Sequence, residues 1–203
     1  MFRWLSQTVT VIGLSLRSIP QRLGPSIVAI VGITGVVVTF VAVLSIAEGF
    51  NAAMANAGSP DTAIIMRGGS NAELNSALAL DATRIIADAP GIRRGAAGPM
   101  ASAELFVIVN IPKKSTGTDA NVPLRGVQAG AFDVRPEVEI VEGRRFSPGT
   151  NEIVVGRAAS NLFANLELGA VNRWGENTWT VVGIFEAAGT ISESEIWCDA
   201  AVL

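Results

Sequence analysis

The side chains able to carry out catalysis or bind a metal are few in this sequence of 203 residues. It contains no histidine and no tyrosine, and Cys198 is its one cysteine. The absence of histidine removes the commonest general base and the commonest zinc ligand. A single cysteine excludes an internal disulfide and a site built from several thiolates. We predict no catalytic residue and no metal site. We expect Cys198 to be buried near the end of a strand; a reactive thiol, or one paired between chains, is the alternative.

Two pairs of glutamates have a spacing that could support acid–base chemistry. Glu137 and Glu139 are two residues apart, as are Glu193 and Glu195, so each pair would share one face of a strand. Paired carboxylates act as general acid and base when one of them is desolvated. Such pairs more often line the solvent side of an edge strand, and we expect both pairs to be exposed.

Motifs for nucleophilic catalysis and for nucleotide binding are lacking. Lys113 and Lys114 could serve a serine–lysine mechanism, but they lie in a predicted exposed loop at residues 112–121, where an ammonium group stays charged. Residues 67–70, Arg-Gly-Gly-Ser, lack the GxxxxGK[ST] spacing of a phosphate-binding loop. We expect no enzyme activity and no cofactor in this chain.

The segment that must position everything else is the apolar run Ile27–Ala47, which contains no charged residue. At about 1.5 Å per residue it would form a helix roughly 31 Å long, which matches a hydrocarbon core of about 30 Å. A cleaved signal peptide ending near Ser45–Ala47 is the alternative, but such apolar regions are only about 7–15 residues long. We predict a transmembrane helix with a short extension beyond it, together covering residues 25–57.

The distribution of charge predicts how this helix crosses the membrane. Three arginines and no acid precede it, namely Arg3, Arg17 and Arg22. Lys and Arg are retained on the cytoplasmic side, so the N-terminus is expected in the cytoplasm and the main domain in the periplasm, anchored to the bacterial inner (plasma) membrane. The formal net charge is −3, and the part after the helix is more acidic still because those arginines precede it. An acidic surface argues against a nucleic-acid partner.

The predicted transmembrane helix has two unlike faces. Gly32, Gly35, Thr39 and Ala42 fall on one side, and the bulky aliphatic residues Ile30, Ile33, Val37, Val41 and Leu44 fall on the other. Small residues allow the backbone of a second helix to approach closely. We interpret the first set as a helix-packing face, although glycine and alanine are common enough in membrane helices for the pattern to arise by chance.

Residues 1–24 are predicted to form a cytoplasmic amphipathic helix in the membrane interface. Its apolar face consists of Trp4, Leu5, Val9, Ile12, Leu16 and Ile19. A basic amphipathic helix with a tryptophan beside a membrane span is typical of a helix that lies in the interface. Packing against a protein partner is the alternative.

Residues 58–203 read as an α+β domain with a mixed or antiparallel sheet. Strands are expected at residues 63–66, 103–109, 122–127, 138–141, 152–155, 179–185 and 195–198, and helices at residues 80–89 and 158–165. The final residues, 199–203, resemble the first turn of a helix, so we expect the domain to be incomplete at its C-terminus.

The order of these elements resembles the N-terminal part of MacB-type, FtsX-like ABC transporter permeases. The resemblance rests on an ordered set of short motifs, Ile46–Phe50, Asp61–Gly69, Val141–Phe146, Asn151–Gly156 and Trp179–Phe185. It covers nearly the whole chain. The turn at Leu168–Val171 is compressed relative to the family pattern.

The resemblance implies a permease subunit, or a fragment of one, whose periplasmic core domain follows the first membrane helix. It implies a cytoplasmic ABC ATPase subunit that binds the ATP, a dimer with itself or with a second permease, and a periplasmic partner protein. The expected role is coupling of ATP hydrolysis to periplasmic export or mechanotransmission. A single-pass anchored adaptor with no transport role is the main alternative, and an anchored hydrolase is a third.

Overall fold

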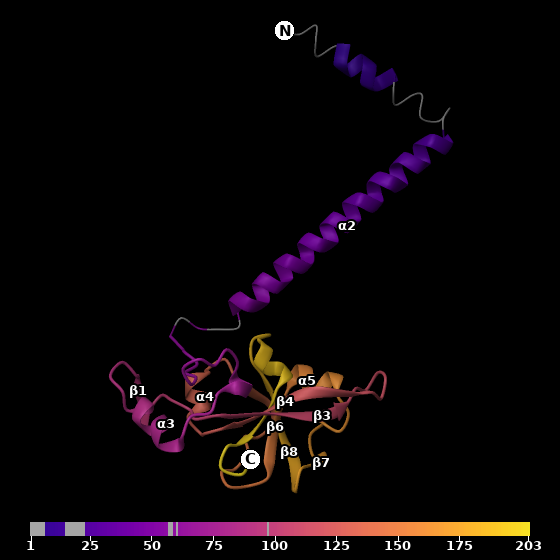
Figure 1. The fold of residues 1–203 in the computed structure, drawn as a ribbon. Coiled ribbons are helices and arrows are strands. Elements are labelled where there is room, and N and C mark those ends of the chain that lie inside the picture. The colour runs from indigo at the N-terminus through magenta and orange to yellow at the C-terminus, as the bar shows by residue number, and fades with distance from the viewer. Residues whose placement is uncertain (1–6, 15–22, 57–58, 60, 97) are drawn as a thin grey trace. The chain divides into compact units, whose positions relative to one another are not determined.

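The computed structural model describes residues 7–14, 23–56, 59, 61–96 and 98–203. The chain divides into two compact units, Met1–Met54 and Ala55–Leu203, and each is described by itself (Figure 1). Four residues assigned to the interfacial face lie outside the described residues: Trp4, Leu5, Leu16 and Ile19.

The first unit is helical where it is described. Residues 7–14 form a short helix on which Val9 and Ile12 are exposed. Helix α2 covers Leu23–Asn56 and has Pro25 in its first turn, where the missing proline N–H costs no hydrogen bond. Its segment Leu23–Asn51 is long and apolar enough to cross a membrane, with a mean hydropathy that reaches 2.8. The helix therefore contains the predicted span Ile27–Ala47 and continues beyond it, as the sequence predicts.

The second unit is built on a mixed seven-stranded sheet with a few short helices. The sheet strands are β3 (Leu105–Pro112), β4 (Asp119–Val127), β5 (Glu139–Gly143), β6 (Glu152–Gly156), β7 (Val171–Trp174), β8 (Asn177–Glu186) and β9 (Ile196–Asp199). A separate small hairpin pairs β1 (Arg94–Gly95) with β2 (Gly98–Pro99). The helical segments are η2 (Glu73–Asn75), α3 (Leu80–Ala87), α4 (Ala131–Val134), α5 (Arg157–Leu162) and η3 (Ile191–Ser194).

The strand order is β3-β4-β9-β6-β8-β5, and β7 pairs with β8 off this path. β4 and β9 are parallel, as are β6 and β8, whereas the other neighbours are antiparallel. The two central parallel pairs join segments far apart in the chain, since Leu124 of β4 pairs with Ile196 of β9. The predicted α+β fold with a mixed sheet is confirmed.

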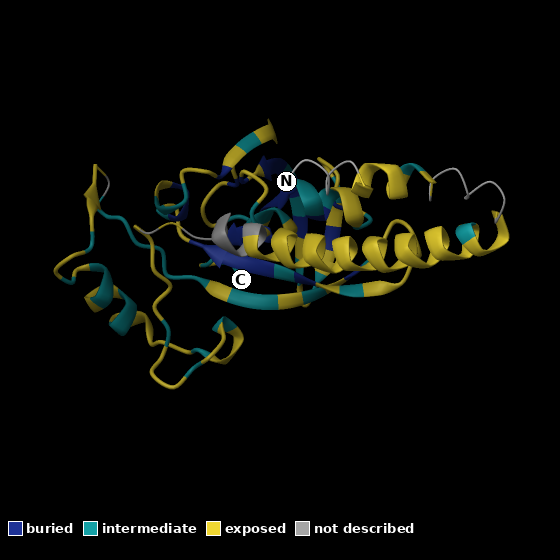
Figure 2. Ribbon diagram, turned by 90° about the horizontal axis from the view of Figure 1, so that it is seen from above, coloured by how far each residue is buried: buried dark blue, intermediate teal, exposed yellow. Residues whose placement is uncertain are grey.

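The sheet is buried on both faces because its central strands carry apolar residues on both sides (Figure 2). Along β9, Ile196 and Cys198 belong to one core and Trp197 to the other. The first core also contains Ile111, Val122, Leu124, Ile153, Val155, Ala159, Leu166, Trp179, Val181 and Ile184. The second contains Val127, Ala131, Phe132, Val138, Phe146, Val154, Phe185 and Ala187. Strands buried on both faces are typical of the centre of a layered α/β structure.

Most predicted elements are found within a few residues of their expected bounds, and one is not. The expected strand at residues 63–66 belongs to no helix or strand, because it has no partner strand among the described residues. The sequence also gave no prediction for β1, β2, α4 or the short edge strand β7. At the C-terminus, the amides of Val202 and Leu203 both donate to the carbonyl of Asp199, which forms the predicted turn.

Candidate functional site

Three of the four residues of the predicted helix-packing face lie in one shallow groove along α2. Gly32, Gly35 and Thr39 line it together with Val31, Val36, Phe40 and Val43, whereas Ala42 does not. A Cβ atom added at Gly32 or Gly35 would meet nothing within 4 Å. The surface at these two glycines is therefore open in this structure.

The hydroxyl of Thr39 is already engaged inside its own helix. Its Oγ1 donates a hydrogen bond of 2.8 Å to the carbonyl oxygen of Gly35. In the hydrocarbon region this bond keeps the hydroxyl hydrogen satisfied. Toward a second helix, Thr39 Oγ1 can therefore accept a hydrogen bond, whereas its own hydrogen is already donated to Gly35.

The α+β unit contains a buried ionic cluster, which we call the Arg125 cluster. Its members are Arg125, Glu195, Glu73, Glu104 and Arg135. Arg125 lies in β4 and is 7% exposed, so burial of its charge requires several compensating partners. Two guanidinium groups and three carboxylates meet here.

Arg125 and Glu195 form the centre of the cluster. The Nε and Nη2 atoms of Arg125 each donate to one carboxylate oxygen of Glu195, at 2.8 Å and 2.8 Å. Trp197 Nε1 donates to the same carboxylate at 2.8 Å. The guanidinium group also lies over the ring of Phe106, 4.7 Å from its centroid. A paired-donor geometry of this kind gives both direction and strength to an ion pair.

The remaining partners connect three peripheral segments to the sheet. Arg125 Nη1 donates to Glu73 of η2 at 2.6 Å and to Glu104, just before β3, at 3.0 Å. Arg135, the residue after α4, donates to both oxygens of Glu104 at 2.6 and 2.9 Å. The cluster therefore ties η2 and the residue before β3 directly to Arg125, and it ties the end of α4 to Arg125 through Glu104.

The electrostatics of the cluster favour the charged forms of Glu104 and Arg125. Burial alone would raise the pKa of Glu104, but hydrogen bonds and charge from Arg135, with the charge of Arg125, outweigh it and lower that pKa below its ordinary value. Burial alone would lower the pKa of Arg125, but its bonds to Glu195 and Glu73 raise it instead. The contacts among these side chains therefore support a structural role for the cluster.

The sequence-based interpretation of Glu193 and Glu195 as an exposed pair on one strand face is wrong. Glu193 lies in η3 and accepts the amides of Ala187 and Gly189, at 2.9 and 2.8 Å, whereas Glu195 is buried against Arg125. The detectable sign was Arg125 itself, a lone charge inside the otherwise uncharged run Val122–Val127. Glu137 and Glu139 are exposed, as predicted.

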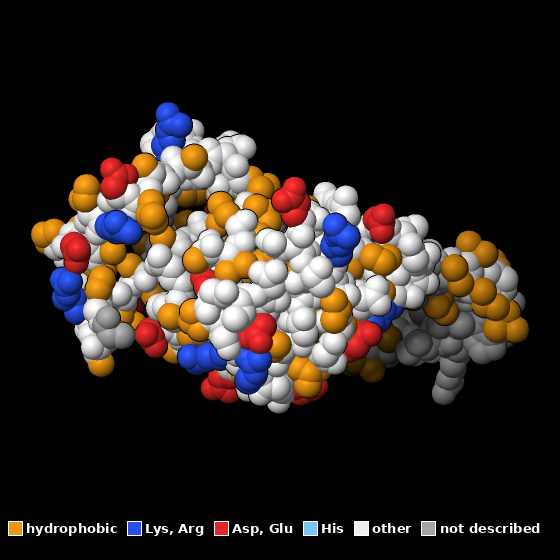
Figure 3. Space-filling model, turned by 90° about the horizontal axis from the view of Figure 1, so that it is seen from below, with side chains coloured by type: hydrophobic (Ala, Val, Ile, Leu, Met, Phe, Trp, Pro, Cys, Tyr) orange, Lys and Arg blue, Asp and Glu red, His pale blue; other side chains and the backbone are white. Residues whose placement is uncertain are grey.

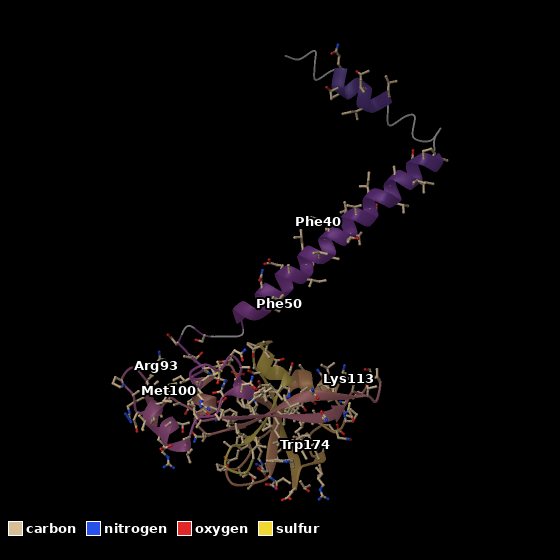
Figure 4. The ribbon with its side chains drawn as sticks, in the orientation of Figure 1. Phe40, Phe50, Arg93, Met100, Lys113 and Trp174 are labelled. Carbon is tan, nitrogen blue, oxygen red and sulfur yellow. The ribbon has the colours of Figure 1, made fainter. Side chains whose placement is uncertain are left out.

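The other residues considered for chemistry do not assemble into a site. Lys113 lies at the tip of the β3–β4 hairpin (Figure 4), and Lys114 Nζ donates to the carbonyl of Ser160 at 2.7 Å. Cys198 is buried in β9, and burial, with a smaller effect of Asp199, raises the pKa of its thiol to about 12. Within the described residues, no three His, Cys, Asp or Glu side chains gather in a way that could hold a metal ion.

Comparison with known proteins gives a match to one family. Residues 26–203 match the family model described as MacB-like periplasmic core domain. No curated protein sequence matches the chain.

Two solved structures are similar to this chain at low sequence identity. The periplasmic region of MacB from Actinobacillus actinomycetemcomitans is 13% identical, with a TM-score of 0.46, over 68% of this chain and 64% of that one. The extracellular domain of the noncanonic ABC-type transporter YknZ from Gram-positive bacteria is 17% identical, with a TM-score of 0.43, over 62% of this chain and 64% of that one. The chain thus spans less than two thirds of either solved domain.

Proposed function

Because the chain belongs to the family of MacB-like periplasmic core domains, we propose that it acts as the anchored N-terminal part of an ABC transporter permease subunit. The family match over residues 26–203, which begins within the apolar helix α2 and continues through the α+β unit, is the observation that carries this proposal. The domain would take part in periplasmic export or mechanotransmission driven from the cytoplasm.

The energy source in this proposal is a separate ATPase subunit. The sequence has no phosphate-binding loop, and buried Arg125 and Glu195 are paired with each other within the Arg125 cluster. The role assigned to this chain is therefore mechanical: its folded domain moves, or is held, when a cytoplasmic ABC ATPase hydrolyses ATP. A dimer with itself or a second permease, and a periplasmic partner protein, complete the proposed assembly.

The proposed topology places residues before α2 in the cytoplasm and the α+β unit in the periplasm. The three arginines before the apolar helix support this orientation, since basic residues resist export. Reporter fusions after Gly24 and after Gly69 test it directly. A cytoplasmic signal from the first fusion and a periplasmic signal from the second are expected; the reverse pattern, or release of the domain after Ala47, contradicts it.

Association with an ATPase is the decisive test of the function. The tagged full-length chain is crosslinked in the membranes of its native host, purified in detergent and its partners are identified by mass spectrometry. An ABC-type ATPase is expected, and its rate of ATP hydrolysis should change when the chain is added back in lipid nanodiscs. Recovery of periplasmic proteins alone, with no ATPase, would instead support the single-pass adaptor.

A further inference from the structure

The loop at residues 67–76, which contains η2, is closed by hydrogen bonds between its own residues. The amide of Arg67 donates to Ser76 Oγ at 2.9 Å, and Ser70 Oγ donates to the carbonyl of Asn75 at 3.0 Å. The amide of Ser70 also donates to the carbonyl of Arg67 at 3.0 Å. A compact surface loop whose two ends are joined in this way can keep its shape while it moves as a unit.

Glu73 connects this loop to the sheet. Its carboxylate accepts a hydrogen bond of 2.6 Å from Arg125 Nη1, on β4. Glu73 is also the most exposed member of the Arg125 cluster, since its side chain is 29% exposed, against 9% for both Arg125 and Glu195. Water and dissolved ions can therefore compete for this carboxylate more readily than for the other carboxylates of the cluster.

Arg125 would keep its other partners if Glu73 moved away. Its Nε and Nη2 atoms donate to Glu195, and its Nη1 atom donates to Glu104 as well as to Glu73. Glu104 also accepts two hydrogen bonds from Arg135. Without Glu73 the cluster holds two positive and two negative charges, whereas the full cluster has one surplus negative charge. Departure of Glu73 thus leaves no buried charge without a partner.

The ion pairs on the surface of the domain lack this combination of a buried and a partly exposed partner. On the face shown in Figure 3, acidic and basic side chains are interspersed. A pair such as Arg94–Asp88, in which both side chains are exposed, contributes little. The Glu73–Arg125 contact is different because its guanidinium group is buried and held in place, while its carboxylate remains accessible to water.

We propose that the loop at residues 67–76 is a latch on the sheet, which opens when Glu73 leaves Arg125 while the other four charges stay paired. Among the described residues, opening moves the first side-chain hydrogen bond between the chain after α2 and β4 from Glu73 to Glu104. The chain that connects α2 to this attachment point is therefore longer in the open state. Under the proposed function, on which this consequence rests, a longer connection would transmit movement of α2 to the sheet less directly.

Distances between spin labels in the full-length chain, reconstituted in lipid nanodiscs, test the latch. Labels on Ala72→Cys and Asn121→Cys measure the distance from the loop to β4. Labels on Asn121→Cys and Glu139→Cys measure the distance across the sheet from β4 to β5. These three positions are exposed, and buried Cys198 should remain unlabelled.

Charge reversal at the latch should open it. Glu73→Lys places a positive charge next to Arg125, so we expect the loop-to-β4 distance of the parent chain to be replaced by a broad distribution of longer distances. The distance across the sheet should stay unchanged, because the other four charges remain paired. Glu176→Lys makes the same change at an exposed carboxylate in the β7–β8 turn and should alter neither distance.

The parent chain itself should open when salt is added. Ions screen a partly exposed charge pair, so the population with longer loop-to-β4 distances should grow several-fold between about 0.05 M and about 0.5 M NaCl. Three results would each overturn the proposal: equal loop-to-β4 distances in Glu73→Lys and the parent, a change in both measured distances together, or a parent chain that stays closed at high salt.

The test of the latch is separate from the test of the proposed function. The latch is read from the two distances, and the function is read from ATPase association of the parent chain. A latch that opens in a chain without an ATPase partner would refute the function alone. ATPase association of a chain whose loop never opens would refute the latch alone.

Discussion

Gly156, the last residue of β6, packs directly against the backbone of Glu193 in η3. A Cβ atom at position 156 would overlap the carbonyl oxygen of Glu193. The Gly156 amide donates to the carbonyl of Glu195 at 2.9 Å. This close approach holds η3 against β6, and η3 directly precedes Glu195, the partner of Arg125. Gly156 therefore helps to position Glu195 in the Arg125 cluster, although it is far from both residues in the sequence.

We predict that Gly156→Ala destabilises the domain by about 1–3 kcal/mol, because the added methyl group must displace backbone atoms. Alanine can adopt the backbone angles of this residue, φ −64° and ψ 145°, so the overlap is the cause. Gly68→Ala is the matched control, since a Cβ there meets nothing within 4 Å. Urea unfolding of the full chain in detergent, followed by tryptophan fluorescence, measures both; similar midpoints for the two variants would contradict the prediction.

Removal of the central arginine should be more damaging than removal of an exposed one. Arg125→Met leaves Glu195 buried without its partner, and breaking a buried pair in this way costs about 3–5 kcal/mol. Arg157→Met removes two ion pairs whose carboxylates, on Glu142 and Glu186, are 50% and 49% exposed, so it should cost below about 1 kcal/mol. The same unfolding measurement compares them. A smaller loss for Arg125→Met than for Arg157→Met would show that the cluster does not stabilise the domain.

Stability should fall in acid because the cluster requires ionised carboxylates. The folded-state pKa of Glu104 lies below its ordinary value of 4.5, so its contribution is complete above that pH and is lost as the pH falls through the folded-state value. The Arg144 hydrogen bond likewise lowers the pKa of Glu152 to about 2. We expect the free energy of unfolding of the parent chain to decrease from pH 5 towards pH 2.

Glu104→Gln tests which carboxyl is responsible. The variant should be less stable than the parent at pH 7, and the difference should shrink as the parent Glu104 becomes protonated. Unfolding free energies measured at several pH values provide the comparison. A difference between parent and variant that stays constant from pH 7 to pH 2 would exclude Glu104 as the titrating group.

The helix-packing face of α2 gives a prediction in the membrane. Gly35→Ile fills the open groove and should weaken association with other membrane helices by about 1–3 kcal/mol, since close backbone approach drives such packing. Val37→Ile exchanges one exposed aliphatic side chain for another and should change little. Two-hybrid association in the membrane compares the two variants, both of which should insert. Equal behaviour would mean that the small residues of this face are an accident of composition.

Local patterns in the sequence were sufficient for the elements whose burial depends on nearby residues. The uncharged run Ile27–Ala47 predicts the long helix, and the alternation of residues 103–109 predicts β3 close to its observed bounds. A helix forms the hydrogen bonds of its backbone within its own segment, so it can be predicted from that segment. A strand with alternating apolar residues shows in its own sequence which face is buried.

Residues 63–66 show the limit of such reasoning. Their composition predicts a strand, but a strand forms only when a second segment accepts its backbone hydrogen bonds. In this structure no described segment does so. The same four residues therefore led to a wrong assignment within the chain.

The sequence by itself determined the apolar helix and the α+β character of the domain. Only the tertiary structure decided that Glu195 is buried, because its partner Arg125 is 70 residues away in the chain. Whether a carboxylate faces solvent or a guanidinium group depends on which strands become neighbours. The parallel pairing of β4 with β9 brings Arg125 and Glu195 together. No local pattern in the sequence predicts that pairing.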